Sequence, residues 1–279
     1  MSIIFNPMSK ELSDLPGKVV LVTGGSGVLG SSIAESLLEA GSKVAVTYRS
    51  GTSIKEKVDA WNDEGKECIA IPMNVLERFS IEKGRDTILN AWGKIDALVN
   101  AAGGNVPGTV IPPDKSVFDL SMDALHTVMD LNLYGTVVPT LSIGKLMAEQ
   151  GHGSIINISS MASSQSISRI IGYSMAKAGI DNFTKWMALE LATKYGDGIR
   201  VNAIAPGFFI SNQNRNILLD EKGEYTERAH KIINNTPMGR FGEPKELNGI
   251  VQYLCSDSSK FVTGTVITVD GGFSSYSGV

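Results

Sequence analysis

Seven short apolar segments, separated by stretches with helical spacing, limit this chain to one class of fold. In chain order the segments are Val19–Val22, Lys43–Thr47, Cys68–Ile71, Ala97–Asn100, Ser154–Ile158, Ile199–Ala203 and Val266–Val269. Each lacks a polar face, which is the pattern of strands covered by helices on both sides. The alternation indicates βαβ units. The sequence therefore predicts an α/β fold, a doubly wound parallel sheet of about seven strands with helices on both faces.

The intervening segments and the absence of linkers predict a single domain. Amphipathic spacing predicts helices over Ser31–Ala40, Ser53–Glu64, Met122–Gln150 and Tyr173–Tyr195. We expect one domain over residues 16–279, preceded by an N-terminal extension over residues 1–15. The length of 279 residues lies within the reach of one hydrophobic core, about 250–300 residues.

Two segments look irregular, Gly103–Ser116 and a stretch from Pro206 to about Pro237. Loops this long in an α/β domain usually cover a ligand site. We therefore expect a substrate loop or lid over about residues 206–240.

Charge and cysteine content exclude several classes of protein. The chain has 25 basic and 29 acidic residues, a net charge of −4, which argues against a nucleic-acid-binding protein. No stretch approaches the roughly 18 apolar residues of a membrane span, and the N-terminus does not read as a secretory signal. Cys68 and Cys255 are far apart, and His126, His152 and His230 are scattered. We therefore expect a cytoplasmic protein with reduced thiols, no metal site and no membrane partner.

A glycine-rich turn joins the first predicted strand to the first predicted helix. Residues 25–30 read Gly-Ser-Gly-Val-Leu-Gly, a G-x-G-x-x-G pattern in the strand–turn–helix context that it requires. Glycines let the backbone approach a pyrophosphate, and the first N–H groups of the helix bind the anion. We therefore expect a Rossmann-type dinucleotide site, with these cofactor-binding residues: Gly24, Ser26, Gly27, Leu29 and Gly30.

The end of the second predicted strand bears on the choice of cofactor. An acidic residue here would bind the ribose hydroxyl of NAD, whereas a cation suits the 2′-phosphate of NADP. The residues are Tyr48, Arg49 and Ser50, with no acid. Arg49 can hold a phosphate through a bidentate contact, although it can equally be a solvated arginine. The sequence favours NADP(H) and leaves NAD(H) open.

Tyr173 and Lys177 lie four residues apart at the start of a predicted helix, so they share one face. Ser160 ends the preceding predicted strand. Over residues 16–279 the chain resembles the short-chain dehydrogenase/reductase family, on motifs in this order: Thr23–Gly30, Asn100–Gly103, Asn132, Ser160, Tyr173-x-x-x-Lys177 and Pro206–Gly207. The resemblance implies a nicotinamide-dependent oxidoreductase.

These residue types suit carbonyl reduction. Hydride addition to a carbonyl produces an alkoxide that must be protonated, and Tyr173 can donate that proton. Tyrosine ordinarily has a pKa of about 10, which a nearby Lys177 ammonium and the positive oxidised nicotinamide would lower. Ser160 can donate a hydrogen bond to the developing oxyanion. The resemblance implies that Asn132 continues a proton relay through water to the lysine. We predict Asn132, Ser160, Tyr173 and Lys177 as catalytic residues, with Tyr173 as the base in oxidation.

The resemblance implies further cofactor contacts along the chain. Asn74 and Val75 would lie at the adenine, where the family usually has Asp-Val. Tyr173 and Lys177 would also contact the cofactor. The remaining contacts are a group that would line the cofactor and support the sheet, and a group that would hold the nicotinamide carboxamide: Asn100, Ala101, Ala102 and Gly103, then Pro206, Gly207, Phe209 and Ser211.

One residue departs from the family pattern. The usual first motif is Thr-Gly-x-x-x-Gly-x-Gly, but Val28 stands at the second glycine position and Gly27 precedes it. Because a β-branched residue does not readily adopt a positive φ, we expect a locally different turn that still binds the cofactor.

The variable segments resemble the D-mannonate oxidoreductase (fructuronate reductase) group, which acts on sugar acids. The similar stretches are residues 102–105, 206–215, 235–242 and 270–279. A polyhydroxy acid needs many hydrogen-bonding groups and a cation. We predict these substrate-binding residues: Asn105, Ser160, Arg169, Gln213, Asn214 and Arg215. Arg215 is the first candidate for the carboxylate, and Arg169 is the second.

Three functions stay open at this stage. The first is a sugar-acid oxidoreductase of the mannonate type. The second is a reductase of another polyol or keto acid, such as gluconate or an alginate-derived uronate. The third is a non-catalytic regulatory protein that senses the cofactor, which the intact catalytic residues disfavour. The resemblance also implies a homotetramer, with the tail around Phe273 and Tyr276 at a subunit interface.

Overall fold

Seven parallel strands form one sheet, in the order β3-β2-β1-β4-β5-β6-β7, within the residues that the structure describes (14–51, 53–106, 108–211 and 214–278). The structure is a computed structural model. The strands are β1 (Val19–Thr23), β2 (Lys43–Tyr48), β3 (Cys68–Pro72), β4 (Ala97–Asn100), β5 (Gly153–Ile158), β6 (Ile199–Pro206) and β7 (Val266–Val269). Every neighbouring pair is parallel. The predicted fold class is confirmed.

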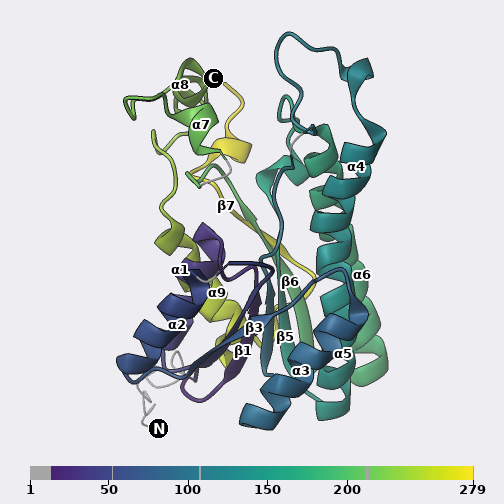
Figure 1. Cartoon of the computed structure of the whole chain (residues 1–279). Coiled ribbons are helices and arrows are strands. Elements are labelled where there is room, and N and C mark those ends of the chain that lie inside the picture. The colour runs from purple at the N-terminus through teal and green to yellow at the C-terminus, as the bar shows by residue number, and fades with distance from the viewer. Residues whose placement is uncertain (1–13, 52, 107, 212–213, 279) are drawn as a thin grey trace, which may run out of the picture.

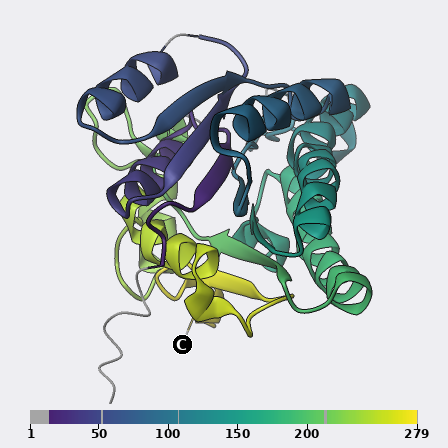
Figure 2. The ribbon, with the colours of Figure 1, turned by 90° about the horizontal axis from the view of Figure 1, so that it is seen from below.

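Helices cover both faces of the sheet (Figures 1 and 2). They are α1 (Val28–Glu39), α2 (Ser53–Asp63), α3 (Arg78–Trp92), α4 (Met122–Met129), α5 (Gly135–Gln150), α6 (Ile171–Tyr195), α7 (Arg215–Leu218), α8 (Glu227–Asn234) and α9 (Asn248–Cys255). Side chains alternate along β1, so that Val20 and Val22 pack with α1, α2 and α9. Val19 and Leu21 pack with α3, α5 and α6 on the other face. This double coverage is the reason why the strands lack a polar face.

The segment Met122–Gln150 is not one continuous helix, contrary to the prediction. A π-helical turn over Asp130–Tyr134 separates α4 from α5. Two side chains bond to the backbone here: the Asn132 amide donates to the Val128 carbonyl (2.8 Å), and the Thr136 hydroxyl donates to the Asn132 carbonyl (3.0 Å). Such insertions disturb the regular helical ladder. Asn132 therefore lies in a π-helical turn, outside the regular α-helical hydrogen-bond pattern.

The segment from Pro206 to Pro237 is more regular than predicted, because it contains α7 and α8. These helices form a small apolar cluster of their own, centred on Leu218, Ala229, Ile232 and Phe241. They stand above the carboxyl edge of the sheet in Figure 1, beside the C-terminal tail. Both helices therefore pack in a cluster separate from the two cores of the sheet, whereas Phe209 of the same segment belongs to the core that contains α1, α2 and α9.

The C-terminal tail packs partly on its own chain. The ring of Phe273 contacts Phe208 edge-to-face, with centroids 5.2 Å apart. Tyr276 stays 41% exposed. Of the two aromatic residues predicted at a subunit interface, only Tyr276 thus remains largely open to a partner.

Candidate active site

Four strands end at one edge of the sheet and bring the predicted motifs together there. The glycine turn follows β1, Asn100 ends β4, Ser160 follows β5, and Pro206 ends β6. The strand order reverses between β1 and β4, because β2 and β3 lie on one side of β1 and β4 to β7 on the other. In doubly wound sheets ligands bind at this point, outside the carboxyl ends of the strands.

The glycine turn has the backbone geometry of a phosphate cradle. Gly24 has a φ of +68°, and a Cβ there would lie 2.8 Å from the backbone of Ala102. A Cβ on Gly30 would collide with the carbonyl oxygen of Gly24. Helix α1 begins after Gly27 with no side-chain cap and no acidic residue in its first turn. An open helix N-terminus next to a side-chain-free turn suits a pyrophosphate, so the turn fits a dinucleotide.

Val28 does not need the positive φ that caused the expectation of a different turn. It is the first residue of α1, and Gly27 before it has a φ of −77°. Among the described residues, Arg169 is the one non-glycine residue with a positive φ. Valine is therefore accommodated as an ordinary helical residue, while Gly24 and Gly30 are positions in this turn where a side chain would collide with backbone.

The adenosine end of the site carries two cations and no acid at the end of β2. Arg49 and Ser50 are exposed beyond Tyr48. The ammonium of Lys55 lies 5.5 Å from the centroid of the Tyr48 ring. On the neighbouring strand, the Asn74 oxygen accepts from the Leu76 N–H (3.1 Å) and its amide donates to Glu77 (2.7 Å). The adenine contacts of Asn74 and Val75 stay predictions.

Asn100 supports the sheet from inside, as one part of its predicted role. Its amide donates to Thr140 on α5 and to Asn157 on β5, both at 2.9 Å. The Asn157 amide donates in turn to Thr184 on α6 (2.9 Å). The side chain of Asn100 therefore points into the protein, and Asn100 can line a cofactor only through its backbone.

Ser160 and Tyr173 form the centre of the predicted catalytic group. The Ser160 oxygen accepts from the N–H of Ala162 (3.2 Å), which fixes the serine at the end of β5. Tyr173 enters from the first turn of α6. Burial raises the pKa of the Tyr173 phenol, and a hydrogen bond from Ser160 opposes that rise. A phenol with a raised pKa keeps its proton at neutral pH, as a proton donor must.

Lys177 lies one helical turn beyond Tyr173 and is buried. Its ammonium donates to the Ile158 carbonyl (2.7 Å) and lies 5.4 Å from the centroid of the Tyr173 ring. Burial lowers the Lys177 pKa to about 8, and Asp181 partly opposes this. The ammonium is thus still charged near neutral pH, where it favours ionisation of the neighbouring phenol.

Asn132 closes the group from the π-helical turn. Its amide donates to the Gly104 carbonyl, and its oxygen accepts from the Gly104 N–H, both at 2.8 Å. A Cβ on Gly103 would lie 2.7 Å from the Asn132 oxygen and 3.5 Å from the Lys177 nitrogen. Asn132 and Lys177 therefore border the same small space beside Gly103, which suits the predicted relay.

A cavity of about 210 Å³ opens onto Ser160 and Tyr173. Predicted cofactor residues form one part of its lining, including Leu29, Pro206, Gly207, Phe209 and Ser211. Two predicted substrate residues, Asn105 and Asn214, also line it. Gln213 lies outside the described residues. The cavity joins the expected nicotinamide end of the site to the segment over residues 206–240.

The two predicted arginines do not line this cavity, but a third arginine does. Arg215 is exposed on α7, and Arg169 lies in the segment before α6. Arg228 on α8, which the sequence analysis missed, is part of the lining together with Ile232. Arg228 lies four residues before Ile232 and so shares its helical face, but only the fold places that face at the cavity.

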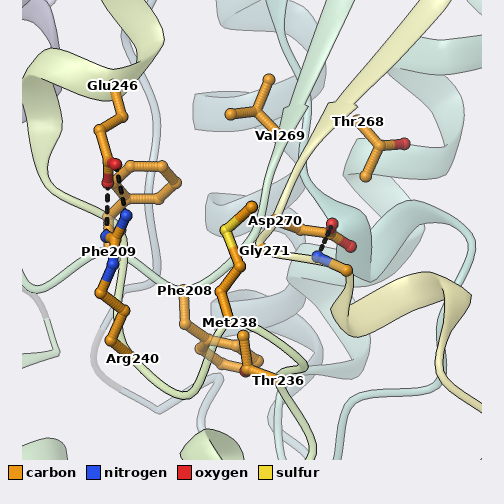
Figure 3. Close-up of a pocket in the computed structure, with 12 residues that line it drawn as sticks. Phe208, Phe209, Thr236, Met238, Arg240, Glu246, Thr268, Val269, Asp270 and Gly271 are labelled. Carbon is orange, nitrogen blue, oxygen red and sulfur yellow. Dashed lines mark hydrogen bonds and ion pairs between the residues drawn. The ribbon is translucent and has the colours of Figure 1, made fainter.

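A second cavity, of about 420 Å³, lies next to this one behind Phe208 and Phe209. Figure 3 shows its charged side chains engaged within the protein: Arg240 donates to both oxygens of Glu246 (2.6 and 2.7 Å), and Asp270 accepts from the Gly272 N–H (2.9 Å). Its lining does not include Ser160 or Tyr173. The smaller cavity is therefore the one that can support proton transfer.

Comparison with known proteins shows the family. The family described as Enoyl-(Acyl carrier protein) reductase matches residues 26–274. An uncharacterized oxidoreductase of Bacillus subtilis, UxuB, is 40% identical over 275 residues, which cover 95% of this chain and 98% of the relative. The chain belongs to the short-chain dehydrogenase/reductase family. It is an NAD(P)-dependent oxidoreductase.

Two solved structures share the whole fold. A putative D-mannonate oxidoreductase from Haemophilus influenzae, with bound NAD, is 41% identical with a TM-score of 0.87, over 95% of this chain and 98% of the other. A gluconate 5-dehydrogenase from Burkholderia cenocepacia, in complex with NADP and tartrate, is 30% identical with a TM-score of 0.83, over 95% and 98% of the two chains. None of the helices in the described residues is long and apolar enough to cross a membrane.

Proposed function

We propose that this protein interconverts a keto sugar acid and the corresponding hydroxy acid, of the fructuronate–mannonate type. The observation that carries the proposal is the shared cavity, in which a serine–tyrosine proton-transfer pair faces an arginine and an asparagine. The similar structures named as a mannonate oxidoreductase and a gluconate dehydrogenase support the same substrate class. The substrate partner is thus a small anionic molecule, not a nucleic acid.

The proposed reaction uses the residues as follows. A bound nicotinamide supplies a hydride to the carbonyl carbon in reduction. Tyr173 transfers its phenolic proton to the carbonyl oxygen, where the π electron pair of the C=O bond forms the new O–H bond; the electron pair of the new C–H bond would come with the hydride. Ser160 donates a hydrogen bond to that oxygen as negative charge develops on it. Lys177 stabilises the phenolate left behind, and the space beside Gly103 and Asn132 admits the water through which the proton is replaced.

We propose NADP(H) as the preferred cofactor, with NAD(H) accepted. Arg49 is exposed at the end of β2, where the 2′-phosphate of NADP would lie. Lys55 on the Tyr48 ring adds a second cation nearby. Of the two solved structures described above, one holds NAD and the other NADP, so both cofactors are compatible with the family.

We further propose that residues 206–240 form a substrate lid and that the protein is a cytoplasmic homotetramer. The lid proposal rests on α7 and α8, which line the cavity through Ile217, Leu218, Arg228 and Ile232. The tetramer proposal rests on exposed apolar side chains of α6, including Trp186 and Leu189. The cytoplasm suits the two buried free thiols, Cys68 and Cys255. Light scattering of the purified protein checks the tetramer, since a monomeric mass would contradict it.

The substrate proposal is tested with a panel of carbonyl compounds, followed by absorbance of the reduced cofactor. The panel contains fructuronate and other hexuronates, 5-ketogluconate, an alginate-derived unsaturated uronate product and a 3-oxoacyl thioester. We expect the highest kcat/KM with a ketohexuronate. Faster turnover of 5-ketogluconate or of the uronate product would favour the second candidate, which the gluconate dehydrogenase neighbour supports. Turnover of the thioester alone would contradict the proposal, and no turnover of any ketone would favour a sensor.

A further inference from the structure

One arginine lines the cavity, and a second, from a separate segment outside the lining, lies near it; neither has an acidic partner among the described residues. Arg228 belongs to the first turn of α8 and lines the cavity with Ser160 and Tyr173. Arg169 lies in the segment before α6 and follows Ser168, whose hydroxyl accepts a hydrogen bond from the Arg228 guanidinium (3.2 Å). Within the described residues, no aspartate or glutamate forms an ion pair with either of them. Two cations without an acidic partner beside a reaction site suit the binding of an anion.

The guanidinium of Arg228 is positioned by neutral groups. It donates to the Ser168 hydroxyl (3.2 Å) and toward the Ser168 carbonyl (3.4 Å). The nearest acid on its own helix, Glu227, pairs with Lys231 at 2.6 Å instead. Burial, followed by the charge of Arg169, lowers the Arg228 pKa. The remaining guanidinium N–H groups are available for a bidentate contact with a carboxylate.

The location of Arg228 is costly for the free protein. Thr226 caps α8, so Arg228 is in the first turn, where the helix dipole already places partial positive charge. A cation there interacts unfavourably with the helix dipole, whereas an anion bound at the same point would be stabilised by both the dipole and the Arg228 guanidinium. A binding role accounts for a charge distribution that stability alone would disfavour.

The backbone of Arg169, next to Arg228's partner Ser168, is strained. Arg169 is the one non-glycine residue with a positive φ, 76°, among the described residues. A hydrogen bond from the Ile111 N–H to the Arg169 carbonyl (2.9 Å) ties this strained residue to the segment over residues 103–116. Backbone strain of this kind concentrates at binding sites. The strained turn holds the second cation beside the first.

A third group completes the recognition of a hydroxy acid. The side-chain oxygen of Asn105 lines the same cavity, is buried, and has no hydrogen-bond partner among the described residues. Asn214, in contrast, is engaged in its own loop, accepting from the Ser211 N–H (2.7 Å) and donating to the Phe209 carbonyl (2.8 Å). The cavity thus offers an acceptor for a substrate hydroxyl at Asn105 and donors for an anion at Arg228.

We propose that Arg228, with Arg169 beside it, binds the carboxylate of the substrate while Asn105 accepts a hydrogen bond from one of its hydroxyl groups. This inference rests on the proposed sugar-acid function and deepens it, because it replaces Arg215 as the specificity-determining residue. The substrate carbonyl then lies between the carboxylate site and the Ser160–Tyr173 pair.

The test compares Arg228→Gln, Arg228→Lys and the control Arg78→Gln on α3, whose side chain is exposed and pairs with Glu82. Initial rates are measured with fructuronate and with the neutral ketose in which a CH2OH group replaces the carboxylate. We expect Arg228→Gln to lose about 10- to 100-fold more kcat/KM on the acid than on the ketose, the range for hydrogen bonds to a charged group. Arg228→Lys should recover part of the loss, and Arg78→Gln should match wild type. Equal losses on both substrates would overturn the inference.

A binding measurement separates this inference from the proposed function. Calorimetric titration of tartrate into the cofactor-loaded enzyme needs no turnover. Tartrate binding that is weakened by Arg228→Gln and kept by Arg78→Gln supports the anion site, even if no sugar acid is reduced, in which case the proposed function alone fails. Tartrate binding that does not depend on Arg228, or no binding to wild type, refutes the anion site. Cofactor fluorescence and circular dichroism of each variant establish that it is folded and loaded.

Discussion

Burial of Lys177 predicts a pH dependence of folding stability that a single substitution should remove. The side chain is 4% exposed, and its pKa falls from 10.5 to about 8 in the folded protein. Below about pH 8 both folded and unfolded chains hold the proton, so the full penalty of burying the ammonium applies. Between the two pKa values the unfolded chain binds more protons, so stability rises with pH. At about 1.4 kcal/mol for each pKa unit, the whole effect is about 3 kcal/mol.

The assay is urea unfolding followed by tryptophan fluorescence, at fixed protein concentration, from about pH 7 to pH 9.5. About 2 kcal/mol of the rise falls within this range, below the region where Tyr173 ionises. We expect stability to rise with pH by about 2 kcal/mol more in wild type and in the control Lys185→Met, an exposed lysine on the same helix, than in Lys177→Met. The buried thiols of Cys68 and Cys255, whose pKa burial raises to about 12, lower stability over the same pH range equally in all three proteins, so the difference between the proteins is the quantity compared. Parallel curves for wild type and Lys177→Met would show that Lys177 is not a buried ammonium and would refute the reasoning.

Three further predictions concern proton transfer, the space beside Gly103 and the cofactor. Tyr173→Phe should lower kcat by about 10²- to 10⁴-fold, with cofactor binding by fluorescence unchanged, because the ring stays and only the proton donor is lost; retained turnover would exclude Tyr173. Gly103→Ala should lower stability by about 1–3 kcal/mol and reduce kcat, because its Cβ would press on the Asn132 oxygen, whereas Gly249→Ala, with open space around it, should not. Arg49→Gln should raise the KM for NADPH about tenfold or more and leave that for NADH unchanged, whereas a wild type that strongly prefers NADH would contradict the role of Arg49.

The strands and the glycine turn were predictable because both signals are local. A buried parallel strand is apolar on both faces, as Val19–Val22 is. At Gly30 any side chain would collide with the backbone of Gly24, so this position requires glycine. The four catalytic candidates were found through their order along the chain, and the fold brings them to one edge.

The remaining features depend on contacts that a sequence pattern does not contain. The π-helical turn contains Asn132, whose side chain bonds to Gly104, 28 residues earlier. Helix α7 has only four residues and α8 only eight, and both are stabilised by packing in the cluster around Phe241. Arg228 was missed because its significance comes from Ser168 and Arg169, which lie on a different segment.

The buried run of amides and hydroxyls from Thr140 through Asn100 and Asn157 to Thr184 has a mechanical consequence. Asn100 lies three residues before Gly103, and Asn157 lies three residues before Ser160. These hydrogen bonds therefore help to fix the distance between β4 and β5, and with it the spacing of the two loops that follow these strands and contain Gly103 and Ser160. Leucines at positions 100 and 157 would remove these bonds and deprive the buried hydroxyls of Thr140 and Thr184 of these partners, so the alignment of the two loops depends on hydrogen bonds beneath the site.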